Sequence, residues 1–182
     1  RYAEAYFYIG YCNGEIGRYA EAIEAFKQVI RIKPDYAEAH YNLGVTYGKL
    51  GRYKEEIESY KQAIRIKPDL AEAHWNLGWA YFKLGRYAEA IKACKQAIRI
   101  KPDYAKVYSS LGLAYVKLGR YAEAIKACKQ VIRIKPDDAE AHCFLGVVYL
   151  LNGDKGSALE EYKILKKLDK DLSNKLFNLI YK

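Results

Sequence analysis

Apolar residues recur along the chain at spacings of three and four, which places side chains on one face of an α-helix. Between positions 53 and 66, for example, Ile57, Tyr60 and Ile64 follow this spacing among charged residues. Pro68 is then expected to end the helix. No segment alternates apolar and polar residues as a half-buried strand does. The pattern therefore predicts an all-α protein.

The helical pattern returns every 34 residues. Segments 85–103 and 119–137 differ at only one position, Ala97 against Val131, and the prolines fall at 34, 68, 102 and 136. We predict five repeats of two helices, at 3–36, 37–70, 71–104, 105–138 and 139–172. A last helix over 173–182 is expected to cover the apolar face of the fifth repeat. Such helix pairs bury their apolar faces only by stacking on one another.

Recurring glycines and aspartates predict the ends of the helices. A glycine such as Gly51 is expected to form the turn within each pair. Asp35 with Glu38 has the spacing of a capping box, and so have Asp69 with Glu72 and Asp137 with Glu140. In the first repeat, Asn13 replaces a recurring tyrosine and Gly14 follows it. We therefore expect its first helix to be weak there.

One repeat carries the residues by which a known family is recognised. Along 71–104 these are Trp75, Leu77, Gly78, Tyr81, Gly85, Tyr87, Ala90, Ala97 and Pro102. In this respect the chain resembles the tetratricopeptide repeat (TPR) family, and the resemblance covers nearly the whole chain. It implies a right-handed superhelical solenoid of antiparallel helix pairs. In that family the first helices line a concave groove, and most members bind other proteins there.

The residues themselves point to the same face. Segments 71–84 and 105–118 match at half of their positions, and pairs such as Trp79/Leu113 and Phe82/Val116 differ. The differing positions lie on one helical face, opposite Leu77 and Tyr81, as expected of a face that stacking does not constrain. The predicted ligand-binding residues are Phe7, Tyr11, Tyr41, Asn42, Trp75, Asn76, Trp79, Phe82, Lys106 and Leu113. The competing interpretation is that Trp75 and Trp79 pack against the adjacent repeat.

Charge supports an alternative function. The chain has a formal net charge of +9, and the repeats at 71–104 and 105–138 hold most of the excess, largely in their second helices. These helices could attract an anion or nucleic acid. The absence of an arginine-rich tail argues against nucleic acid, and a charge run more often marks a solvated face. A further alternative is a targeting segment of a larger enzyme, since a chain without methionine is expected to be part of a longer protein.

No group of residues suggests catalysis, a metal or a cofactor. His40, His74 and His142 share one repeat position, which predicts a structural role better than a catalytic one. The four cysteines lack the spacing of a zinc site, and Cys94 and Cys128 share a packing position. The carboxylate clamp of chaperone-binding TPR proteins is matched only in part, at Asn76 and Lys106 or at Asn42.

We thus predict a noncatalytic scaffold that binds a protein or peptide partner. Nearly identical repeats also allow self-association, since their stacking surfaces can pair end to end. No apolar run is long enough for membrane insertion. Four cysteines without a disulfide framework favour a reducing compartment, and we predict a cytoplasmic protein.

Overall fold

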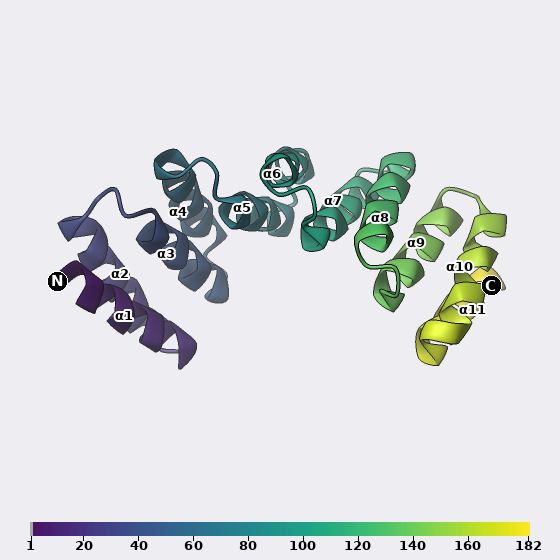
Figure 1. Cartoon of the computed structure of the whole chain (residues 1–182), viewed down its shortest axis with the longest axis horizontal. Coiled ribbons are helices and arrows are strands. Elements are labelled where there is room, and N and C mark those ends of the chain that lie inside the picture. The colour runs from purple at the N-terminus through teal and green to yellow at the C-terminus, as the bar shows by residue number, and fades with distance from the viewer. Residues whose placement is uncertain (1) are drawn as a thin grey trace. The chain divides into compact units, whose positions relative to one another are not determined.

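A computed structural model describes residues 2–182, and all regular structure in that range is helical. The helices are α1 (Tyr2–Glu15), α2 (Tyr19–Ile32), α3 (Ala37–Lys49), α4 (Tyr53–Ile66), α5 (Ala71–Lys83), α6 (Tyr87–Ile100), α7 (Ala105–Lys117), α8 (Tyr121–Ile134), α9 (Ala139–Leu151), α10 (Lys155–Leu168) and α11 (Lys170–Ile180) (Figure 1). They pack in sequential antiparallel pairs. The predicted all-α solenoid is confirmed. None of these helices has the length and apolar character that a membrane crossing requires.

The helices form two compact units. The first unit extends to Lys101 and contains α1 to α6, and the second unit runs from Pro102 to Lys182 and contains α7 to α11. In each unit the two helices of a pair pack together, and the second helix also packs against the next pair. In the first unit, Leu43 and Tyr47 of α3 are thereby buried against Phe26 of α2.

The glycine turns are confirmed. Gly51 has a φ of +69°, which L-residues with a side chain rarely adopt. Its N–H donates to the carbonyl oxygen of Gly48 at 3.1 Å, and the N–H of Arg52 donates to that of Tyr47 at 3.0 Å. These bonds satisfy carbonyl groups that the end of α3 would otherwise leave unpaired.

Three sequence-based details were wrong. Asp35, Asp69 and Asp137 do not cap the first helices, because the N-cap lies one residue later, at Tyr36, Leu70 and Asp138. Of these only Asp138 has a carboxylate, and it accepts from the N–H of Ala141 at 3.0 Å.

Helix α1 continues through Asn13 and Gly14, held by its packing on α2. Helix α11 begins at Lys170 and buries Leu176 and Ile180, whereas Leu179 points outward because it lies on another side of the helix.

The recurring histidines connect α3, α5 and α9 to the loops that precede these helices. Nε2 of His40, His74 and His142 lies 2.9 to 3.0 Å from the carbonyl oxygen of the proline six residues earlier. Because a carbonyl oxygen only accepts, this nitrogen must carry the proton. In the fourth repeat the hydroxyl of Tyr108 donates to Pro102 in the same way, at 3.1 Å. A structural role therefore explains the histidine position.

Cys94 and Cys128 lie in the cores of their helix pairs. Both are buried, and burial raises the pKa of each thiol to about 12. Cys94 packs under Gly78, where a Cβ atom would lie 2.9 Å from its sulfur. Their role is packing, as their shared repeat position predicted.

This burial predicts selective thiol reactivity. Cys12 is exposed and should react with a maleimide within minutes at pH 7, whereas Cys94 and Cys128 should react only on unfolding, because the thiolate is the reactive form. Mass spectrometry of peptides after timed labelling measures this order. Equal labelling rates for Cys12 and Cys94 in the folded protein would contradict it.

Candidate functional site

The first helices of the repeats form a layer of their own in the first unit. Helices α1, α3 and α5 contact one another in sequence, and α2, α4 and α6 pack on their other side (Figure 1). We call the side of α1, α3 and α5 that faces away from the second helices the first-helix face. On α5, Leu77 and Tyr81 are buried toward the packed side, whereas Trp75, Trp79 and Phe82 stay partly exposed.

An aromatic stack lies at the end of α5. The rings of Trp79 and Phe82 are 5.3 Å apart and almost parallel, with an interplanar angle of 4°. The edge of this stack meets Tyr87 of α6, whose ring centroid is 5.3 Å from that of Phe82. The ammonium of Lys83 lies 5.0 Å from the Trp79 ring. The stack is therefore held in place before any ligand binds.

Tyr41 and Asn76 join neighbouring repeats. The amide Nδ2 of Asn76 donates to the hydroxyl of Tyr41 at 3.0 Å, which links α5 to α3. The Tyr41 ring packs on the ring of Tyr60 at 5.7 Å, and burial raises the pKa of Tyr41. Both predicted residues thus have a structural contact in addition to their place on the face.

Tyr11 and Asn42 line a small hollow between α1 and α3. Its volume is about 70 Å³, and Gly10, Gly14 and Val45 complete part of its wall. One amide hydrogen of Asn42 is used within its own helix, because Nδ2 donates to the carbonyl oxygen of Glu38 at 2.7 Å. Tyr11 is 49% exposed, and Phe7 is less accessible because its ring packs on Phe26 and Tyr36.

Lys106 and Leu113 belong to the second unit. Lys106 is exposed on α7. Leu113 lines a hollow of about 170 Å³ between α7 and α9, together with Ser109 and Phe144. The other eight predicted residues belong to α1, α3 and α5 of the first unit, where Phe7 and Tyr41 also pack on side chains of the second helices.

Glu56 was not predicted from the sequence. Its side chain is only 6% exposed, and burial raises the pKa of its carboxyl to about 7, while a hydrogen bond from Tyr60 acts in the opposite direction. The carboxylate fills the space beside Gly48, where a Cβ atom would lie 2.7 Å from Oε1. The sequence held a signal for this. Gly48 stands at the repeat position of Phe82, and Glu56 at that of Ala90.

Lysines beside the face were also missed. Lys49 lines the hollow between α1 and α3, and Lys83 contacts the Trp79 ring. Lys49, Lys83 and Lys117 recur at one repeat position. Their recurrence does not distinguish them from framework residues, because a constant residue can also line a variable surface.

Comparisons with known proteins agree with this architecture. The family model described as TPR repeat matches residues 15–51, 49–85, 79–119 and 112–153. A crystal structure of MamA protein is 33% identical, with a TM-score of 0.87, and the alignment covers 92% of each chain. No curated protein sequence matches the chain.

Two more distant structures share the fold. MamA 41-end from Desulfovibrio magneticus RS-1 is 22% identical with a TM-score of 0.86, covering 93% of this chain and 96% of that one. YrrB, described as a TPR protein with an unusual peptide-binding site, is 19% identical with a TM-score of 0.82. That alignment covers 95% of this chain and 90% of YrrB.

Proposed function

Because the chain belongs to the tetratricopeptide repeat family, whose repeats form protein-binding scaffolds, we propose that it binds a partner peptide or helix on the first-helix face. The partner is an extended peptide or an amphipathic helix, anchored by Trp75, Trp79 and Phe82. The scaffold itself is noncatalytic. One observation carries this proposal, which is the preformed aromatic stack on a partly exposed face of α5.

The stack is suited to anchoring an apolar side chain. Aromatic residues contribute a large contact area, and Trp is enriched among the residues that dominate binding energies. Since Phe82, whose ring also contacts Tyr87, already stacks on Trp79, little side-chain entropy remains to be lost on binding. The hollow between α1 and α3 then offers room for a second side chain of the same ligand.

Polar groups on the face can orient the ligand backbone. The Tyr41 hydroxyl accepts from Asn76 and can still donate its own hydrogen, and Asn42 has a second amide hydrogen. Lys49 at the hollow offers a cation to an acidic side chain. This arrangement resembles a typical peptide site, in which apolar pockets supply the affinity and a few polar groups fix the orientation.

Removing the stack should weaken binding without unfolding the protein. Peptides selected by this chain from a random phage-displayed library should bind the Trp79→Ala variant about 30-fold less tightly, because truncating a central Trp typically costs roughly 2 kcal/mol or more. Titration with labelled peptide measures this loss. In the unsubstituted chain, intrinsic fluorescence reports on the same face, because both tryptophans lie on α5.

The control is Tyr181→Ala, which removes an aromatic side chain that is 58% exposed on the second unit. It should leave the affinity unchanged. A Trp79→Ala variant that binds normally would contradict the proposal. A variant that loses melting temperature in proportion to affinity would assign Trp79 to packing instead. If Trp79→Ala leaves the affinity unchanged and the affinity falls steeply with salt concentration, the basic second helices would be favoured as the binding site.

A further inference from the structure

A hollow of about 460 Å³ lies between α4 and α6 in the first unit, and α5 forms its floor (Figure 1). Its lining includes the apolar residues Ile64, Leu77 and Ala93. Because α5 contributes residues of its packed side, the hollow lies across α5 from the first-helix face. Its volume is in the range of pockets that hold a ligand. We call this hollow the second-helix groove.

The charged side chains that line the groove are mostly cationic. Lys61 and Arg65 come from α4 and Lys92 from α6, and all three are exposed. The carboxylate in the lining, Glu89, accepts from Nε of Arg86 at 2.9 Å, and this hydrogen bond lowers the pKa of its carboxyl. Within residues 2–182, no side-chain hydrogen bond or ion pair engages Lys61, Arg65 or Lys92. These three cations are therefore available to an anionic ligand.

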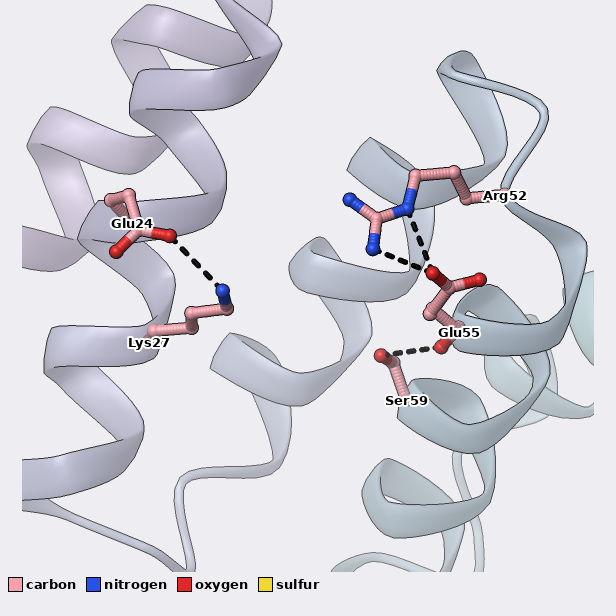
Figure 2. Close-up of polar contacts among 5 residues, drawn as sticks. All are labelled: Glu24, Lys27, Arg52, Glu55 and Ser59. Atoms are coloured by element: carbon pink, nitrogen blue, oxygen red, sulfur yellow. Dashed lines mark hydrogen bonds and ion pairs between the residues drawn. The ribbon is translucent and has the colours of Figure 1, made fainter.

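The corresponding side chains of α2 and α4 carry a different balance of charge. Lys27 of α2 stands at the repeat position of Lys61, and its ammonium lies 3.0 Å from the carboxylate of Glu24 (Figure 2). On α4, Glu58 stands at the repeat position of Lys92, so a carboxylate replaces that cation. In the first unit, the excess of positive charge thus belongs to the groove between α4 and α6.

The fifth repeat indicates what kind of group suits this groove. Glu161 of α10 stands at the repeat position of Ala93 of α6. A Cβ atom on Gly146 would lie 3.4 Å from Cβ of Glu161. One on Gly78, the equivalent glycine, would lie 3.5 Å from Cβ of Ala93. The two positions are therefore equivalent in space as well as in sequence.

The Glu161 carboxylate binds the recurring histidine of its repeat. Its Oε2 lies 2.6 Å from Nδ1 of His142, and both side chains are largely buried. Nε2 of His142 already donates to the carbonyl oxygen of Pro136 at 2.9 Å, so an ionised Glu161 accepts from the imidazolium form. A charge-assisted hydrogen bond of this kind is about twice as strong as a neutral one. The fifth repeat thus supplies a carboxylate to its own histidine.

The third repeat keeps the histidine and lacks the carboxylate. Nε2 of His74 lies 2.9 Å from the carbonyl oxygen of Pro68, which holds the ring as in the fifth repeat. Ala93 has only a methyl group, and both His74 and Ala93 line the groove. In the second repeat Ser59 takes the position of Ala93, and its hydroxyl donates to the carbonyl oxygen of Glu55 at 2.8 Å (Figure 2). The groove therefore has room for a carboxylate that a ligand brings to His74.

We propose that the second-helix groove is a second binding site, separate from the first-helix face, and that it takes an acidic segment of a partner protein. A glutamate of that segment places its carboxylate at Nδ1 of His74, as the fifth repeat does with its own glutamate. A neighbouring apolar side chain packs on Ile64, and further acidic side chains meet Lys61 and Lys92. Because the groove offers several cations, a segment with several carboxylates complements it better than a small molecule with one.

Peptides selected from a random phage-displayed library on the Trp79→Ala chain test this proposal, because that variant lacks the aromatic stack of the first-helix face. We expect peptides with a net negative charge and a glutamate beside an apolar residue. In anisotropy titrations of their fluorescein-labelled copies, Ala93→Glu should weaken binding at least about tenfold, because it supplies the carboxylate from within the chain. Lys61→Glu with Lys92→Glu should weaken binding about tenfold.

Lys27→Glu with Lys126→Glu is the matched control, because it makes the same change of charge at the equivalent positions outside the groove. It should leave the affinity unchanged. Ala93→Glu should melt close to the parent chain, since the fifth repeat accommodates glutamate at this position.

Four results would overturn the proposal: no peptide enriched in the selection, selected peptides without acidic residues, equal binding by Ala93→Glu, or an equal loss in the control. Tighter binding of a labelled oligothymidylate than of any selected peptide, lost in Lys61→Glu with Lys92→Glu, would overturn it too, since the groove would then be a nucleic-acid site. Each of these outcomes leaves the first-helix face untested, because every titration uses a chain without Trp79.

Discussion

Glu56→Gln should stabilise the protein by about 3 kcal/mol at pH 8 and leave its stability at pH 4 nearly unchanged. Glu56 is buried beside Gly48, and burial raises the pKa of its carboxyl from 4.5 to about 7. Glutamine has nearly the same shape, keeps an oxygen that can accept from Tyr60, and carries no charge. The variant therefore removes the cost of burying the carboxylate.

The pH window follows from the two pKa values. The unfolded chain loses the proton near pH 4.5 and the folded chain near pH 7, so between these values the folded state binds more protons. The contribution of Glu56 to stability is therefore greatest below pH 4.5, falls as pH rises from 4.5 to 7, and stays low above pH 7. Differential scanning calorimetry of parent and variant across pH 4 to 8 measures the difference directly.

Glu55→Gln is the matched control on the same helix. Glu55 is exposed, and its hydrogen bond from Arg52 lowers the pKa of its carboxyl. Its contribution is present above its unfolded pKa and is lost as pH falls, so this variant should show a small effect of opposite sign. If the free energies of unfolding of Glu56→Gln and of the parent chain differ by the same amount at every pH from 4 to 8, the expectation for Glu56 is refuted.

Gly44→Ala should destabilise the first unit by about 2 kcal/mol. An added Cβ would lie 2.7 Å from Cε1 and 2.9 Å from Cδ1 of Tyr60, whose ring is 2% exposed and has no room to shift. Overpacking of a rigid core lowers the free energy of unfolding by up to about 3 kcal/mol. The better helix propensity of alanine offsets about 1 kcal/mol of this loss. Urea unfolding followed by circular dichroism, with hydrogen exchange at α3 and α4, measures the loss.

Gly112→Ala provides the comparison within the same protein. At this equivalent position the nearest side-chain atoms are Cε1 of Phe144 at 3.3 Å and the sulfur of Cys128 at 3.6 Å. Because cysteine replaces tyrosine there, this substitution should be close to neutral. In addition, Gly44→Ala should cost little when it is added to Tyr60→Cys, since the ring it meets is gone. Equal losses for Gly44→Ala and Gly112→Ala in the parent chain would contradict this explanation.

The sequence predicts the structural role of several residues but not all of their contacts. Cys94 was assigned to packing because it shares a repeat position with Cys128, and both are buried. The shared position of the histidines likewise predicts a structural role, but only the structure identifies their partner, the carbonyl oxygen of the proline six residues earlier. The caps were misplaced by one residue because proline and aspartate occupy a turn before the helix begins.

Only part of the arrangement on the first-helix face follows from the sequence. Position on the helix indicated that Trp79 and Phe82 share a face, since three residues nearly complete a turn. The stacking of their rings, the bond from Asn76 to Tyr41 and the inward packing of Phe7 depend on rotamers and on neighbouring repeats. Those contacts join residues up to 35 positions apart, and a periodic pattern does not specify them.

By itself, the sequence determined the all-α class, the 34-residue repeat and the helix turns, because periodic apolar residues, glycine and proline act through local geometry. Only the tertiary structure decided that Glu56 is buried beside Gly48, whereas Ala90 at the same repeat position leaves room for Phe82. Equivalent positions differ in burial because each repeat is completed by its neighbour. The environment of a residue in this protein therefore depends on which helix packs beside it.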